Sequence, residues 1–109
     1  MKLTRTQNGV RSDSPDTEVS AIVELFGNAR LLAGRSTVEL TLPAEVSAGE
    51  VAGRLAAALP ELVGEVLNPE GGLMTSYILN LNGTAFMSET GRRIKPGDRI
   101  LLFSSQAGG

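Results

Sequence analysis

An apolar run at residues 99–103, RILLF, constrains the fold of this chain more than any other feature. Its last four residues are apolar without a polar break, a pattern typical of a strand buried in the centre of a sheet. Residues 19–26, VSAIVELF, form a second candidate strand, with apolar residues alternating with mixed positions. Because both strands are expected to be buried, we predict that they lie side by side. They are then parallel and joined through a right-handed helical crossover.

The segment between these two runs supplies further strands and a helix. Residues 37–43, TVELTLP, alternate strictly and end at a proline, which cannot donate to a ladder. Ser47 and Glu50 have the spacing of a capping box, and apolar residues recur at helical spacing after them. A third strand at 76–82 ends in Asn-Gly, a strong hairpin signal. The order predicts an α+β protein of the β-grasp architecture, a mixed sheet of about five strands with one main helix across one face.

Smaller features complete this prediction. The sequence KPGD at 95–98 favours a type II turn before the last strand. Pro60 is expected to start a second short helical piece, PELVGEVL, in which Leu62, Val63 and Val66 point inward.

The residue types that the chain lacks exclude several classes of function. Cysteine is absent and histidine is absent. A disulfide framework, a thiolate nucleophile, a zinc–thiolate site and a Ser-His-Asp arrangement are therefore excluded, and we expect no metal site. The net charge is −2 and aromatic residues make up 4%, so neither nucleic acid nor a membrane is an expected partner. Composition favours a carrier, a subunit or a binding module over a self-sufficient enzyme.

The two ends of the sequence differ in pattern from its middle. Residues 1–17 are polar and without helical or strand periodicity, so we predict a flexible extension there. Residues 18–103 carry the β-grasp pattern, and residues 104–109 are predicted to form a flexible tail that ends in Gly-Gly. No stretch resembles the apolar core of a signal peptide or the roughly 18 apolar residues of a membrane span. The expected location is cytoplasmic.

Several of these features together resemble the ubiquitin-like sulfur carriers, and most closely the small subunit of molybdopterin synthase. They are the segment LFGNARLLAG after the first strand, the turn KPGD, the strand RILLF and the final Ala107, Gly108 and Gly109. The likeness covers residues 19–109. It implies a β-grasp fold in which the carboxylate of Gly109 is the reacting group, with Gly108 beside it.

The resemblance also implies that the chemistry is divided between proteins. An E1-like enzyme that uses ATP adenylates the carboxylate of Gly109, and sulfur from a persulfide donor then displaces AMP and leaves a thiocarboxylate. This chain has no GxxxxGK phosphate-binding sequence, which agrees with an ATP site on the partner. The implied acceptor is the large subunit of molybdopterin synthase or another sulfur-accepting enzyme. No permanently bound cofactor is expected.

The physical chemistry of the tail agrees with this role. Six extended residues, Ser104 to Gly109, reach about 20 Å, far enough to enter a partner's active site while the body stays outside. Gly108 and Gly109 have no Cβ and can pass through a narrow channel. Ordering each tail residue costs roughly 1–2 kcal/mol. Docking of the body must offset that cost, and we therefore expect an apolar patch near the root of the tail.

Candidate partner contacts follow from the resemblance and from strand alternation. Phe26 and Phe103 match positions where the molybdopterin synthase small subunit contacts its partners. We expect Ile22 and Leu101 to lie near them on the sheet face opposite the helix. A basic cluster lies around the last turn and consists of Arg92, Arg93, Lys95 and Arg99. We expect it to speed association with an acidic groove on the activating enzyme. The remaining predicted contacts are Arg93, Arg99, Gln106 and Ala107.

Other readings of the sequence stay open. Within the same family, the acceptor can belong to thiamine, cysteine, tRNA or secondary-metabolite thiolation, although the thiamine carrier is usually shorter than this chain. From a different class, the chain can be a ubiquitin-like protein modifier that forms isopeptide bonds through Gly109. A third reading is a β-grasp interaction module whose terminus is inert.

Overall fold

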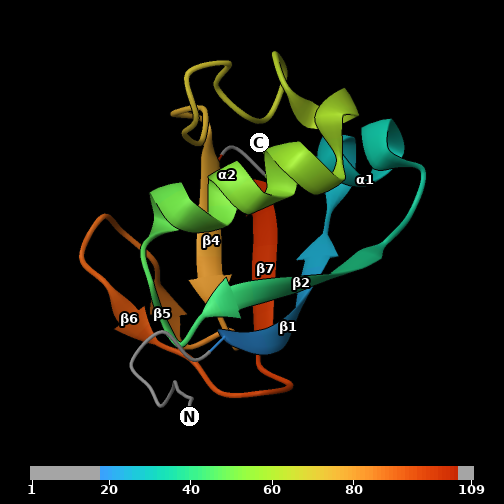
Figure 1. Ribbon diagram of the computed structural model, residues 1–109. Helices are drawn as coiled ribbons and strands as arrows, with labels where there is room; N and C mark the ends of the chain where they lie inside the picture. Colours follow the sequence, from blue (N-terminus) through green and yellow to red (C-terminus); the bar gives the residue numbers. More distant parts are fainter. Residues whose placement is uncertain (1–17, 106–109) are drawn as a thin grey trace, which may run out of the picture.

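A computed structural model describes residues 18–105, in which five strands form one mixed sheet in the order β2-β1-β7-β4-β5 (Figure 1). These strands are β1 (Glu18–Leu25), β2 (Thr37–Pro43), β4 (Tyr77–Leu81), β5 (Ala85–Phe86) and β7 (Arg99–Ser104). Two further short strands, β3 (Glu45–Val46) and β6 (Arg92–Arg93), pair with each other in a separate antiparallel sheet. The helical elements are α1 (Gly27–Ala33), α2 (Ala48–Ala58) and the short 3₁₀ helix η1 (Pro60–Leu62).

The strand β7 lies in the middle of the five-stranded sheet. It is parallel to β1, where Leu102 pairs with Leu25, and antiparallel to β4, where Leu102 pairs with Leu79. Ile100 and Leu102 are fully buried, which accounts for the apolar run in the sequence. The predicted parallel pairing of the first and last strands and the predicted β-grasp fold are confirmed.

The helix α2 begins at the predicted capping box and covers one face of the sheet. The backbone N–H of Glu50 donates to Ser47 Oγ at 3.2 Å, and the backbone N–H of Ser47 donates to Glu50 Oε1 at 2.8 Å. Val51 and Leu55 are fully buried on the side of α2 that faces the core. In Figure 1 the helix lies across the front of β4 and β7. Its apolar stripe and the inner sheet face therefore make one core.

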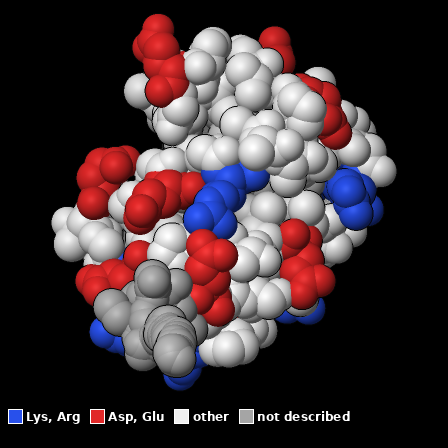
Figure 2. Space-filling model, viewed as in Figure 1, with Lys and Arg blue, Asp and Glu red and all other residues white. Residues whose placement is uncertain are grey.

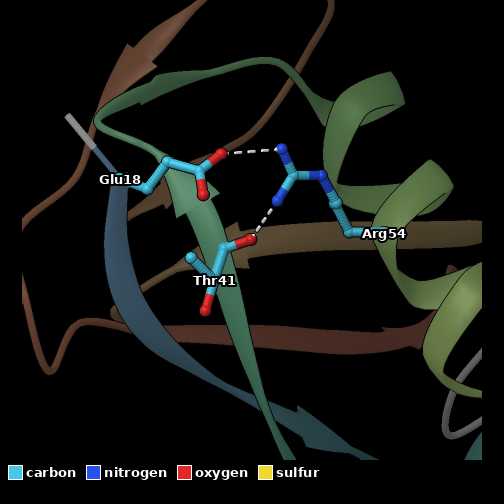
Figure 3. Close-up of polar contacts among 3 residues, drawn as sticks. All are labelled: Glu18, Thr41 and Arg54. Atoms are coloured by element: carbon cyan, nitrogen blue, oxygen red, sulfur yellow. Dashed lines mark hydrogen bonds and ion pairs between the residues drawn. The ribbon is translucent and has the colours of Figure 1, made fainter. Parts of the chain in front are cut away.

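Arg54 connects α2 to the edge of the sheet (Figure 3). Its Nη1 donates to the backbone carbonyl of Thr41, and its Nη2 lies 3.0 Å from Glu18 Oε2. Thr41 belongs to β2, an edge strand, so the guanidinium satisfies a carbonyl group that no neighbouring strand pairs. Because both charged side chains are more than two-fifths exposed, the ion pair itself contributes at most about 1 kcal/mol.

Two predicted turns bring the return strands into register. Asn82 and Gly83 both have positive φ, 56° and 76°, as a type I′ hairpin turn requires. Gly97 has φ of 85°, and the backbone N–H of Asp98 donates to the carbonyl of Lys95 at 3.0 Å. The second turn therefore has the predicted type II form, with Pro96 and Gly97 at its centre.

Some local predictions differ from the structure. The helical piece predicted from Pro60 is present but ends at Leu62 as η1, and the chain then runs as an irregular loop with isolated bridges from Leu67 to Val63 and Leu73. Leu62 and Val66 are buried as predicted, but Val63 is 37% exposed. The β3–β6 pair was not predicted, because strands of two residues have no periodicity to detect.

Three further predictions concern a membrane span, a metal site and the two ends of the chain. No helix within residues 18–105 is long and apolar enough to cross a membrane. Within the same residues, no acidic side chains group in threes in a way that could hold a metal ion. The predicted extension at 1–17 and residues 106–109 of the predicted tail lie outside the described residues.

Replacing Gly53 by alanine tests the packing of α2. A Cβ at this exposed position meets nothing within 4 Å. Since alanine costs less backbone entropy in a helix, we expect Gly53→Ala to raise the free energy of unfolding by about 0.5–1 kcal/mol, measured by urea denaturation. Gly83→Ala, at a positive φ, serves as the control and should lower it. A loss of stability in Gly53→Ala would contradict the packing described.

Candidate functional site

The candidate site is the face of the five-stranded sheet that lies opposite α2, called here the open face. A strand residue whose two neighbours point into the core must itself point to the other side of the sheet. Strand alternation and register therefore assign the side chains of this face. Its apolar residues, together with one asparagine, are Ile22, Ile78, Asn80, Phe86, Leu101 and Phe103.

The strand register places these residues next to one another. Across β4 and β7, Phe103 is opposite Ile78 and Leu101 is opposite Asn80. Across β4 and β5, Asn80 is opposite Phe86. Because directly opposite residues have Cβ atoms roughly 4.5–5.5 Å apart, the open face carries an apolar stripe around Asn80, made up of Ile78, Phe86, Leu101 and Phe103. Of the predicted contacts, Leu101 and Phe103 lie in this stripe, whereas Ile22 lies on the same face of β1 and is opposite Arg99.

The open face is available to a partner, and it differs in chemistry from the α2 side. Phe86 is 64% exposed, and the other apolar residues of the stripe are partly exposed. The space-filling view from the α2 side shows acidic side chains spread over that surface and few basic ones (Figure 2). An exposed apolar stripe backed by a charged opposite side is typical of an interaction surface.

Phe26 lies at the junction of β1 and α1. Its backbone is extended and its N–H donates to the carbonyl of Leu102 at 3.1 Å, which ties the junction to β7. The ring is 43% exposed and lines a hollow of about 140 Å³ together with Glu24 and Arg30. No ion pair involves Arg30 within residues 18–105. This hollow therefore offers an aromatic ring and an unpaired guanidinium to a partner.

The two predicted basic contacts, Arg93 and Arg99, belong to different sheets. Arg99 is opposite Ile22 in the β1–β7 ladder and forms an ion pair with Glu24, so part of its charge is neutralised. Arg93 belongs to β6, where it pairs with Glu45 of β3 in the separate two-stranded sheet. Only Arg99 lies on a strand of the five-stranded sheet.

The root of the tail is fixed by hydrogen bonds to β4. Tyr77 pairs with Ser104 in the ladder. One step further, both the backbone N–H and the Oγ hydroxyl of Ser105 donate to the carbonyl of Ser76, at 2.7 and 3.1 Å. The pairing of β7 with β4 thus continues to the last described residue. The predicted site residues Gln106, Ala107, Gly108 and Gly109 lie outside the described residues.

Sequence reasoning missed Ile78, Asn80 and Phe86 as site residues. The signal was present in the third predicted strand, where Ile78 and Asn80 alternate with Leu79 and Leu81. To use this signal, one also has to know that the third predicted strand lies beside β7 in the sheet. Phe86 needed the hairpin register as well, since that register alone sets it opposite Asn80.

Solved structures share this fold. Small archaeal modifier protein 1 (SAMP1) from Haloferax volcanii aligns with a TM-score of 0.68 and 26% identity, over 83% of this chain and 99% of its own. SAMP1 from Methanosarcina acetivorans aligns at 0.60 and 20% identity, over 85% and 99%. A putative molybdopterin converting factor subunit 1 from Pyrococcus furiosus aligns at 0.59 and 20% identity, over 79% and 97%. No protein-family model matches the chain, and no curated protein matches it.

These likenesses agree with the topology described above. The chain has the β-grasp, ubiquitin-like fold, which it shares with small archaeal modifier proteins and a putative molybdopterin converting factor subunit over nearly their full lengths.

The assignment of the stripe to the surface can be tested by stability. Phe86→Ala is expected to change the free energy of unfolding by no more than about 0.5 kcal/mol, as for other surface substitutions. Leu102→Ala, in the core directly behind the open face, should lower it by about 2–5 kcal/mol. Urea denaturation of both variants measures the contrast. Equal losses would mean that Phe86 is part of the core.

Proposed function

We propose that this chain is a ubiquitin-like sulfur carrier. In this proposal an E1-like enzyme adenylates the carboxylate of Gly109, which is then converted to a thiocarboxylate that donates sulfur in molybdopterin biosynthesis. One observation carries the proposal: β7, the central strand of a β-grasp sheet, leads directly into the sequence SSQAGG. The proposal takes Gly109 as the residue that bears the free α-carboxylate.

The chemistry explains why an external activating enzyme is needed. A carboxylate is a poor electrophile, and its oxygen must first attack the α-phosphorus of ATP, which releases pyrophosphate and leaves an acyl adenylate. Hydrosulfide then forms a carbon–sulfur bond at the carbonyl carbon, and AMP leaves with the electron pair of the broken carbon–oxygen bond. With a persulfide donor the product is an acyl disulfide, which a thiol reduces to the thiocarboxylate. No ionisable side chain of this chain is needed in these steps.

The folded body of the protein docks on the enzyme that activates the tail. Four residues beyond Ser105, fully extended, span at most about 14 Å, which is shorter than the reach expected from the sequence. Ordering these residues in a partner's channel costs roughly 4–8 kcal/mol in total. Burial of the apolar stripe on the open face offsets this cost, and two of its residues, Leu101 and Phe103, belong to the same strand as the root of the tail. The open face is therefore the proposed docking surface for the activating and accepting enzymes.

A second candidate function is modification of other proteins. Two of the structural neighbours are named small archaeal modifier protein 1, which favours it. In that case the ε-amine of a lysine on a target protein attacks the activated carbonyl, and an isopeptide bond forms. Both functions require the same first step at Gly109.

An intact-mass experiment tests the proposal. The protein is incubated with ATP, hydrosulfide and the E1-like enzyme of its own organism. We expect the mass to change by the replacement of one oxygen by one sulfur. The variant that lacks Gly108 and Gly109 serves as the control and should show no change. If the intact chain shows none either, the carrier proposal is wrong.

Two further measurements test the molybdopterin assignment and the protein-modifier alternative. The thiocarboxylated protein is mixed with the large subunit of molybdopterin synthase and its cyclic pterin substrate, and sulfur is expected to pass to the pterin. If sulfur remains on the carrier, the carrier assignment stands and the molybdopterin assignment is wrong. High-mass conjugates in cell lysates that disappear when the diglycine is removed would instead favour the modifier.

A further inference from the structure

Asn80 is unusual among the residues of the open face. It is the only polar residue that is buried within residues 18–105, with 7% of its surface exposed. Its Oδ1 atom is buried without a hydrogen-bond partner in the described structure. The flanking residues Leu79 and Leu81 belong to the core under α2, so strand alternation directs the amide of Asn80 toward the open face.

The fold alone does not account for an asparagine at this position. A buried acceptor that has no donor destabilises the chain that carries it. The neighbouring positions on β4 and β7 hold leucine and isoleucine, which pack on a sheet without such a penalty. An unpaired acceptor in a native structure therefore calls for a partner that the chain itself does not supply.

The surroundings of Asn80 have the features of an interaction hot spot. Leu101 is opposite it on one side, and Phe86 is opposite it on the other. Phe86 lies on β5, an edge strand, and is the most exposed residue of the stripe. A polar group desolvated between apolar anchors is the arrangement in which one hydrogen bond has the largest effect on affinity.

We propose that Asn80 is a recognition residue of the open face, and that its Oδ1 accepts a hydrogen bond from an N–H donor of the docked activating enzyme. The inference rests on the proposed function. The activating enzyme is the committed partner because both candidate functions require it first. Rotation about the soft terminal torsion of the asparagine turns Oδ1 toward the docked surface.

The chemistry of the partner surface follows from this arrangement. It must be apolar where it covers Ile78, Phe86 and Leu101, and it must present one N–H group above Asn80. Because Oδ1 is already buried without a partner, a purely apolar surface gains nothing from it, whereas a surface with an N–H donor gains one hydrogen bond in a desolvated site. Asn80 therefore selects among partners that could all bury the same apolar stripe.

Two variants of Asn80 test the proposal. Asn80→Leu has the same branched shape but a larger volume and makes no hydrogen bond, whereas Asn80→Asp keeps the shape and two acceptor oxygens but has no donor. The E1-like enzyme of the same organism is assayed by ATP–pyrophosphate exchange at increasing carrier concentration, which separates KM from kcat. The melting temperature of each free variant is measured in parallel.

The expected results differ from those of a structural residue. Asn80→Leu should raise the KM for the carrier about tenfold, the effect of losing one hydrogen bond in a desolvated site, with kcat unchanged. Its melting temperature should be equal to or higher than that of the natural chain, because an unpaired buried acceptor is removed. Asn80→Asp should keep KM within about threefold, because a carboxylate also accepts from an N–H donor.

Each other outcome overturns part of the proposal. An unchanged KM in Asn80→Leu means that the amide makes no contact with the enzyme, while the proposed function stands. An equal rise in KM in both variants means that the asparagine donates and does not accept. A large drop in the melting temperature of Asn80→Leu makes Asn80 a structural residue. If the natural chain supports no exchange at all, the proposed function and this inference both fail.

Discussion

The parallel pairing of β1 with β7 is the constraint on which the rest of the structure depends. Parallel neighbours need a long crossover connection, and every element from α1 to β6 lies within it. The crossover carries α2 over one face of the sheet and adds β4 at the free side of β7. As a result the chain leaves the sheet from its central strand. The carbonyl of Ser76 holds that exit with two hydrogen bonds from Ser105.

Alternate side chains of β7 point to opposite faces of the sheet. Ile100 and Leu102 point into the core under α2, while Leu101 and Phe103 belong to the open face. Under the proposed function, stability and recognition are therefore carried by alternate residues of one strand. Because Ser105 follows directly, a partner that docks on the open face also holds the root of the tail. A separate docking domain is not needed for a tail of this length.

The sequence was sufficient to predict the elements whose signals are local. Strict alternation located β2, the pair Ser47 and Glu50 located the start of α2, and positive φ at Asn82-Gly83 and Gly97 agrees with the turns predicted there. The predictions that failed depend on tertiary contacts. The β3–β6 pair is stabilised by elements distant in sequence, and the loop after η1 is held by bridges that no periodicity encodes.

The same division applies to the candidate site. Ile22, Leu101 and Phe103 were predicted for the open face from the family resemblance together with strand alternation. Two residues of the basic cluster belong to different sheets, Arg93 to β6 and Arg99 to β7, and their contact with a partner stays a prediction. Asn80 was missed because its neighbours across the sheet, Phe86 and Leu101, are distant in sequence, and no residue adjacent to it in sequence signals that environment.

The sequence of the tail does not distinguish a sulfur carrier from a protein modifier. Both functions share every step up to the acyl adenylate, and they differ only in whether sulfur or an amine then attacks the carbonyl carbon. A diglycine sequence has no side chain with which to select the nucleophile, so the protein docked over the body must make the selection. A shared fold therefore does not decide the function. The proposed role of Asn80 and Phe86 is in docking the activating enzyme, a step that both functions share, so the choice between the functions falls to the protein that next receives the activated tail.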